Sequence, residues 1–124
     1  MRQIIVVGGG AAGMMAAVAA AEADAAVTLL EKNEKLGKKI YITGKGRCNL
    51  TNAAPMREVQ AQVVSNPRFL YSAFRALTNE DVMRFFERAG CPLKTERGER
   101  VFPVSDHASD VIRACLLYTY DAAD

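Results

Sequence analysis

A diphosphate-binding turn is indicated near the start of the chain by residues 8–13, Gly-Gly-Gly-Ala-Ala-Gly. In a G-x-G-x-x-G pattern the first glycine permits a tight turn and the second lets the backbone approach a pyrophosphate. The third lets a helix pack closely on a strand. We assign these roles to Gly8, Gly10 and Gly13, and we include Ala12 as a further backbone contact. The expected chemistry is anion binding by free N–H groups at a helix N-terminus.

An acidic residue lies where a dinucleotide-binding unit needs one. Glu31 follows Gly13 by 18 residues, close to the roughly 20 typical of the acid that hydrogen-bonds a ribose 2′-hydroxyl. A carboxylate repels a 2′-phosphate, so a site with Glu31 favours FAD or NAD over NADP. Lys32, the next residue, joins the candidate cofactor-binding set.

The elements that must position these residues follow from the hydrophobic pattern. Residues 4–7 predict a short apolar strand, residues 11–23 an alanine-rich helix, and residues 26–30 a second strand that ends at Glu31. Strand, glycine turn, helix and strand is the order of a Rossmann-like βαβ unit. A glycine pattern alone would be weak evidence, but here every flanking element is in place. The predicted fold class is α/β.

A second polar loop occupies residues 43–52, Thr-Gly-Lys-Gly-Arg-Cys-Asn-Leu-Thr-Asn. Such a loop can present several N–H groups to an anion or to a polar ring edge, and Arg47 could hold a phosphate in a fork. Asn49, Thr51 and Asn52 could fix a flavin ring or cap the next helix. From the residues alone, a solvated basic loop is an equally good interpretation.

These segments together resemble the BaiN-like (YhiN-like) family of FAD-binding oxidoreductases. The resemblance rests on residues 8–13, 31–32 and 43–52, and on residues 99–110, which resemble a second signature of that family. It implies an FAD-dependent oxidoreductase with NAD(P)H as electron donor and an enone-like or other small organic acceptor. It also implies that the second loop lines the FAD site, through Gly44, Gly46, Arg47, Cys48, Asn49 and Thr51. It gives no residue that we can name as a catalytic acid or base.

The resemblance extends over residues 1–114, which we predict to be the N-terminal part of an FAD-binding domain. Residues 115–124 depart from the family pattern and are expected to be a non-native tail; a natural short variant is the alternative. We expect a Rossmann-like βαβ unit followed by helices and a small β-hairpin, with an incomplete sheet. For that reason the isolated chain is expected to hold FAD weakly and to show no turnover.

The rest of the chain predicts helices and one hairpin. Extended segments at residues 91–96 and 100–103 flank a turn at Arg97-Gly98, which is typical of a β-hairpin. A helix is expected to begin near Ala108 after a cap at Ser105 or Asp106. Three more helices are expected from residue 56, around residues 69–77, and after a cap at Thr78 or Asn79.

Composition narrows the class of protein. Half of the 124 residues are apolar, which excludes a disordered chain, and a net charge of +2 is too small to argue for a nucleic-acid partner. No apolar run is long enough for a membrane span and no signal peptide is evident, so a cytoplasmic location is the default. Its oligomeric state is left open.

The cysteines and the histidine suggest no metal site. Cys48, Cys91 and Cys115 lack C-x-x-C spacing, which fits a reducing compartment, and His107 is the single histidine. Cys48 is more readily a small buried loop residue than a redox thiol, because no second cysteine lies near it in the chain.

Two other functions remain open. One is an NAD-dependent dehydrogenase that uses the same βαβ unit, although the Arg47-Cys48-Asn49 segment argues against it. The other is a non-catalytic dinucleotide-binding module or an inactive fragment. A yellow chromophore retained on purification would favour the flavoprotein, and a colourless protein that binds NADH would favour the dehydrogenase.

Overall fold

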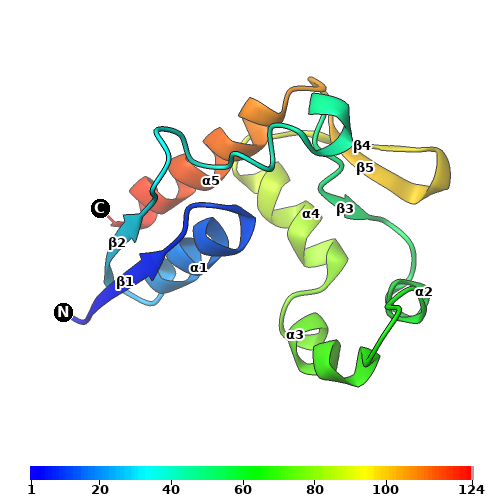
Figure 1. The fold of residues 1–124 in the computed structure, drawn as a ribbon, viewed down its shortest axis with the longest axis horizontal. Coiled ribbons are helices and arrows are strands. Elements are labelled where there is room, and N and C mark those ends of the chain that lie inside the picture. Colours follow the sequence, from blue (N-terminus) through cyan, green and yellow to red (C-terminus); the bar gives the residue numbers. More distant parts are fainter. Residues whose placement is uncertain (124) are drawn as a thin grey trace.

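A computed structural model of the chain describes the backbone of residues 1–123 and the side chains of residues 1–117. A βαβ unit lies at one end of the molecule and a small antiparallel sheet at the other, joined by a long C-terminal helix (Figure 1). The elements are β1 (Gln3–Val7), α1 (Ala11–Glu22), β2 (Ala26–Leu30), η1 (Thr43–Gly46), β3 (Thr51–Asn52), α2 (Met56–Ala61), η2 (Pro67–Leu70), α3 (Tyr71–Ala76), α4 (Asn79–Arg88), β4 (Leu93–Glu96), η3 (Arg97–Glu99), β5 (Arg100–Pro103) and α5 (Ala108–Ala123).

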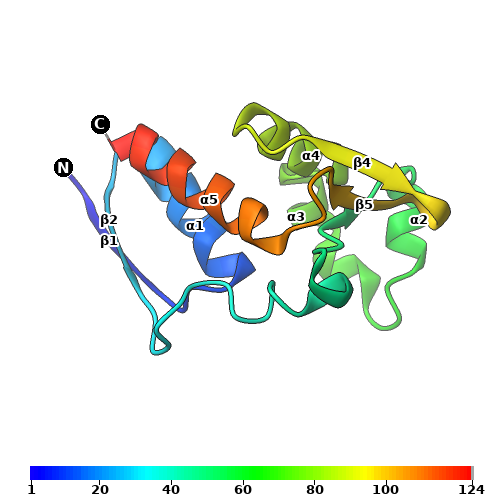
Figure 2. The same ribbon diagram turned by 90° about the horizontal axis from the view of Figure 1, so that it is seen from above.

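The βαβ unit has the predicted order and begins its helix at the predicted residue. β1 and β2 pair in parallel, with Gln3 opposite Ala26 and Val7 opposite Leu30. The apolar stripe of α1 buries Met14 and Val18 together with small alanines. These small side chains let α1 approach both the sheet and α5, which lies alongside it (Figure 2). The prediction of a mixed α/β fold is confirmed.

The small sheet contains one strand that the sequence did not predict. β4 and β5 form the expected antiparallel hairpin, and β3 adds to it in the order β3-β5-β4. Thr51 lies opposite Val101 in this sheet. Thr51 and Asn52 were expected to lie in a loop, so that prediction was wrong: their pairing partners lie far along the chain, and no local pattern shows them.

The helices differ from the prediction at their ends. α2 ends at Ala61, and Val64, which lies beyond its end, is fully exposed. Thr78 caps α4: its side-chain oxygen accepts the Asp81 N–H at 3.0 Å, and the Asp81 carboxylate accepts the Thr78 N–H at 2.9 Å. Asn79 is instead buried, and its Nδ2 donates to the carbonyls of Asn52 and Ala54, both at 2.7 Å. It ties the chain after β3 to α4.

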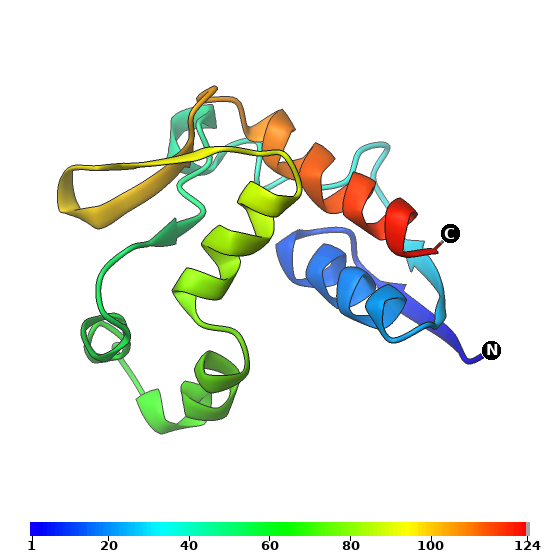
Figure 3. The same ribbon diagram turned by 180° about the vertical axis from the view of Figure 1, so that it is seen from behind.

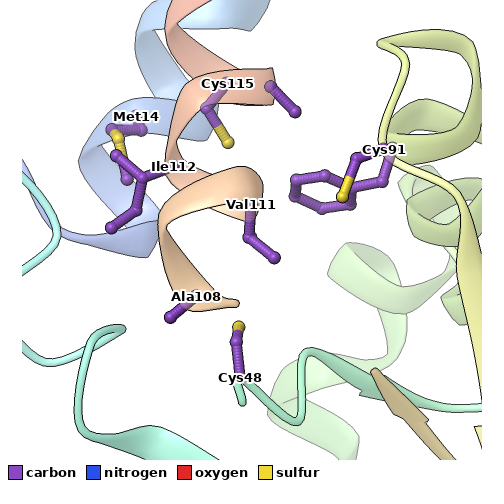
Figure 4. Packing of buried hydrophobic residues seen from close by; sticks show 9 residues of the cluster. Met14, Cys48, Cys91, Ala108, Val111, Ile112 and Cys115 are labelled. Carbon is purple, nitrogen blue, oxygen red and sulfur yellow. The ribbon is translucent and has the colours of Figure 1, made fainter. Parts of the chain in front are cut away.

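One cluster of buried residues joins α1, the η1 loop, α4 and α5 (Figure 4). Figure 3 shows α5 passing next to both α1 and α4. Cys115, at the start of the predicted tail, is buried in this cluster on α5. The boundary predicted at residue 114 therefore falls inside a helix, and the non-native tail stays a prediction. Asp124 lies outside the described residues. The members of the cluster are Met14, Cys48, Phe86, Cys91, Ala108, Val111, Ile112, Ala114 and Cys115.

The parallel sheet is covered on one face only. α1 lies against that face, whereas Ile5, Val7 and Leu30 on the other are 66%, 81% and 50% exposed. Parallel sheets in proteins are normally buried on both faces, so this two-stranded sheet is incomplete, as predicted. No helix among the described residues has the length and apolar character needed to cross a bilayer.

Candidate dinucleotide-binding site

The glycine turn joins β1 to α1 through close backbone contacts. Gly8 has a φ of +102°, a conformation that glycine adopts without strain, and its N–H donates to the Leu30 carbonyl at 2.7 Å. A Cβ added at Gly13 would lie 1.7 Å from the Gly8 carbonyl oxygen. Only glycine fits this contact, which sets the first turn of α1 directly against the end of β1.

The N-terminus of α1 is open. Its N-cap residue, Gly10, is extended and has no side chain to accept a hydrogen bond, and the first turn holds no acidic residue. The first N–H groups of a helix have no partner within the helix, so those of Ala11, Ala12 and Gly13 are available to an anion. A Cβ placed on Gly10 would meet nothing within 4 Å. The backbone at Gly10 is therefore not covered by neighbouring atoms.

Glu31 lies against the glycine turn. Its Oε1 accepts the Gly9 N–H at 2.9 Å and its Oε2 accepts the Asn33 N–H at 2.7 Å. The bond from Asn33, and then that from Gly9, holds the pKa of this carboxyl below its ordinary value. The carboxylate is therefore ionised and fixed at the end of β2, beside the open helix terminus. Lys32 is exposed at the same edge.

The chain after β2 passes directly over the glycine turn. Gly37 N–H donates to the Gly9 carbonyl at 2.8 Å, and Leu36 packs against the core. Sequence reasoning missed Gly37; its only local signal was an isolated glycine within a basic stretch. This contact carries the chain from the βαβ unit towards the second candidate loop.

The loop at residues 43–52 is tightly folded. Gly44, Gly46 and Cys48 all have positive φ values, of 57°, 86° and 61°. A Cβ on Gly44 would lie 2.6 Å from the Asn49 backbone nitrogen, so this position needs glycine. The Cys48 N–H closes the turn by donating to the Thr43 carbonyl at 3.1 Å.

Arg47 projects from this loop into a ring of four charges, which we call the charge ring: Arg47, Lys94, Glu96 and Asp106. Its Nη2 donates to Glu96 at 2.5 Å and its Nε to Asp106 at 2.8 Å. Lys94 Nζ closes the ring on the same two carboxylates, at 3.2 Å and 2.8 Å. The guanidinium also lies 4.0 Å from the ring centroid of the buried Phe102.

The four charges reinforce one another. Hydrogen bonds to Glu96 and Asp106 raise the pKa of Arg47, and Asp106 followed by Glu96 raises the pKa of Lys94. Arg47 is the main cause of the lowered pKa of Glu96, and Lys94 of the lowered pKa of Asp106. Arg47 therefore uses its fork on protein carboxylates. To bind a phosphate as the sequence suggested, it would have to leave them, and that role stays a prediction.

The ring was not visible in the sequence. Glu96 and Asp106 lie 49 and 59 residues from Arg47, and no spacing rule links residues so far apart. Asp106 was interpreted as a helix cap, but its carboxylate is bound by Arg47 and Lys94 instead. At the start of α5, Ser105 Oγ accepts the His107 N–H at 3.2 Å.

Cys48 points into the core, towards Ala108 and Val111 of α5 (Figure 4). Cys48 is 4% exposed. Burial raises the pKa of its thiol, and a hydrogen bond with Thr43 offsets only part of this rise. Burial likewise raises the pKa of Cys91, and that of Cys115 to about 11. Such thiols are protonated and poorly nucleophilic at neutral pH, which fits a packing role. Among the described residues no group of His, Cys, Asp or Glu is arranged to hold a metal ion.

Asn49 and Thr51 are bound to the small sheet. With its amide oriented to satisfy its neighbours, Asn49 donates to the Thr51 and Val101 carbonyls at 3.0 and 3.3 Å. The structure thus brings together one set of candidate residues at the open terminus of α1: Gly8, Gly10, Ala12, Gly13 and Glu31. The other set, Gly44, Gly46, Arg47, Cys48, Asn49 and Thr51, forms a loop held against β5 and α5.

Comparison with known proteins agrees with this geometry. Residues 2–123 match the model of the HI0933-like protein Rossmann domain. The chain is 40% identical over 92 residues to a 3-dehydro-bile acid delta(4,6)-reductase from Clostridium scindens, an overlap of 74% of this chain and 22% of that protein. It is 37% and 36% identical to ribosomal RNA dihydrouridine synthases of Escherichia coli and Haemophilus influenzae, over 56% of this chain and 17% of each.

The chain spans about a fifth of the length of the curated relatives it matches. Within that span the family match covers the βαβ unit, the second loop, the hairpin and α5. The chain belongs to the family of HI0933-like protein Rossmann domains.

Proposed function

We propose that residues 1–114 form the FAD-binding part of a flavoprotein oxidoreductase. The observation that carries the proposal is the Glu31 carboxylate, held on the Gly9 N–H beside the uncapped N-terminus of α1. An ionised acid next to an open helix terminus suits a nucleotide whose ribose has free hydroxyls and whose diphosphate needs N–H donors. The family match and the reductase relative support the same class of protein.

Each part of the chain has a defined task in this proposal. The backbone of residues 8–13 binds the diphosphate, and Glu31 accepts a hydrogen bond from the adenosine ribose. The loop at residues 44–51 shapes the far part of the pocket. The flavin supplies the hydride chemistry when bound, and the protein supplies binding, orientation and exclusion of water.

The proposed reaction is reduction of a carbon–carbon double bond conjugated with a carbonyl group, with NAD(P)H as electron donor. This chemistry is what the activities named for two of the relatives, a delta(4,6)-reductase and a dihydrouridine synthase, have in common. A small enone is the first candidate substrate, because the reductase shares the longer and more similar segment with this chain.

Titration of FAD with the 124-residue chain tests the cofactor, with flavin fluorescence polarisation as the readout. We expect saturable, weak binding of FAD that is reduced strongly by Glu31→Gln, and weaker binding of NADP⁺. Binding of NADH but not of FAD would favour the dehydrogenase, and binding of neither would contradict the proposal.

A chimera tests the reaction. Residues of this chain that match the Clostridium scindens reductase would replace their counterparts in that enzyme. The chimera is expected to retain FAD and to reduce the double bond of a steroid dienone. A folded, FAD-loaded chimera without reductase activity would contradict the proposed chemistry.

A uracil within RNA is the second candidate substrate. Two of the matched relatives are named for acting on ribosomal RNA, and one observation on this chain favours such a substrate. Exposed lysines are concentrated between β2 and η1, in a segment that contacts the glycine turn.

A further inference from the structure

The segment from the end of β2 through η1 is densely basic. Five of the chain's sixteen lysines and arginines lie within residues 32–45, where Glu34 is the only acidic residue. All five lysines are exposed, and no carboxylate among residues 1–117 forms an ion pair with any of them. We call residues 32–45 the lysine segment. Its lysines are Lys32, Lys35, Lys38, Lys39 and Lys45.

The lysine segment is fixed to the fold. Its apolar residues Leu36 and Ile40 pack against the core, and Gly37 donates to the glycine turn. Turns then hold residues 37–43, with the Tyr41 N–H bound to the Gly37 carbonyl at 3.2 Å. The segment runs along one edge of the molecule from β2 to η1 (Figures 1 and 2). The lysines are thus presented to solvent on an anchored backbone.

One dinucleotide does not account for this charge. Its diphosphate would be served by the N–H groups at the α1 terminus, and of the five lysines only Lys32 belongs to the candidate cofactor-binding residues. A nucleic-acid strand carries a negative charge on every nucleotide and suits a segment with several exposed lysines outside ion pairs. Lys35 Nζ lies 6.0 Å from the centroid of the Tyr41 ring. The whole chain has a net charge of only +2, so this concentration is local and is hidden in the total.

We propose that the lysine segment binds the phosphate backbone of a single-stranded RNA and holds it beside the proposed flavin site. This inference rests on the second candidate substrate of the proposed function and names the surface that would bind it. Tyr41 and Ile42, 39% and 73% exposed, lie between Lys39 and Lys45 and offer a ring and an apolar surface to unstacked bases.

An anionic lipid surface is a less suitable partner. Membrane-surface binding commonly uses an amphipathic helix with a broad apolar face. The lysine segment consists of bends, turns and a short 3-10 helix, and its apolar residues Leu36 and Ile40 face the core instead. RNA therefore fits the segment better.

Fluorescence anisotropy of a labelled single-stranded RNA tests the proposal with the 124-residue chain. The variant replaces three lysines, Lys35→Gln, Lys38→Gln and Lys39→Gln. A matched control removes three exposed arginines elsewhere, Arg57→Gln, Arg68→Gln and Arg75→Gln. Each triple variant loses three positive charges, and circular dichroism checks that each variant folds.

We expect salt-dependent RNA binding by the wild type that the lysine variant weakens about tenfold or more at low salt. The slope of log K against log salt should fall by about 2, the value for three lost single-strand contacts. The arginine control should keep most of the affinity and slope. Equal losses in both variants, or no RNA binding by the wild type, would overturn the proposal.

Two further arms separate the alternatives. Vesicles containing phosphatidylserine that bind more tightly than RNA, with the same lysine dependence, would assign the segment to a lipid surface and overturn the RNA proposal. FAD titration of the wild-type chain keeps the two proposals distinguishable. A wild type that binds FAD but not RNA refutes only the RNA surface, and a wild type that binds RNA but not FAD refutes only the flavin site. The lysine variant is expected to keep its FAD binding.

Discussion

The glycine turn and the charge ring are both candidate parts of one site, but they are held together by different atoms. The turn is built from backbone: Gly8 and Gly13 meet through a carbonyl, and Gly9 binds Glu31 through its N–H. The ring is built from the ends of long side chains drawn from η1, β4 and the start of α5. Backbone contacts in a packed turn cannot shift without moving whole elements, whereas partly exposed ion pairs can rearrange in water.

Gly13→Ala is therefore expected to have the largest effect. Its new Cβ would lie 1.7 Å from the Gly8 carbonyl oxygen, so α1 must move off β1, at a cost of about 2–3 kcal/mol in the free energy of unfolding. Gly10→Ala is the matched control because its Cβ meets nothing within 4 Å, and it should cost less than about 1 kcal/mol. Urea denaturation measures both. Equal costs would show that the close approach is not needed.

Arg47→Gln should have a smaller effect on stability. It removes two ion pairs and the contact with the Phe102 ring, which together link η1 to β4, β5 and the start of α5. The control is Arg84→Gln, which removes ion pairs within α4 only. We expect Arg47→Gln to lower the urea midpoint less than Gly13→Ala but more than Arg84→Gln. If the urea midpoints of Arg47→Gln and Arg84→Gln were equal, the charge ring would add no stability by linking η1 to β4 and α5.

Low pH should remove the contribution of the charge ring to the stability of the folded chain. The pKa values of Glu96 and Asp106 are lowered in the folded chain, so their stabilisation is complete above their unfolded pKa values. It is lost as pH falls from about 4 through the lower folded values. A double variant, Glu96→Gln with Asp106→Asn, should be less stable than the wild type at neutral pH and converge with it in acid. A constant difference across this range would contradict the ring's charged character.

The same contrast explains what could be predicted from the sequence. The βαβ unit follows from short-range patterns: apolar strands, three spaced glycines and an acid at the end of the second strand. The start of α1 at Ala11 and the place of Glu31 directly after β2 were predicted in this way, whereas the contact of Glu31 with Gly9 was not. The hairpin followed from its turn residues in the same manner.

The contacts between residues far apart in the chain could not be predicted from the sequence. β3 exists because Thr51 and Asn52 meet Val101 and Arg100, and Arg47 meets partners from two later segments. Asparagine is a residue type that often caps helices, yet Asn79 is buried, and its side chain donates to carbonyls 25 and 27 residues away. Each of these depends on where the folded chain brings distant residues, and no local spacing encodes it.

A diphosphate is proposed to bind the open N-terminus of α1 beside Glu31. Titration of the ¹⁵N-labelled chain with FAD, followed by amide chemical shifts, tests it directly. We predict that the largest shifts fall on residues 8–13 and 31–33, and that Glu31→Gln reduces them. Shifts confined to the lysines of residues 35–45, or no saturable shift at the glycine turn, would contradict the claim.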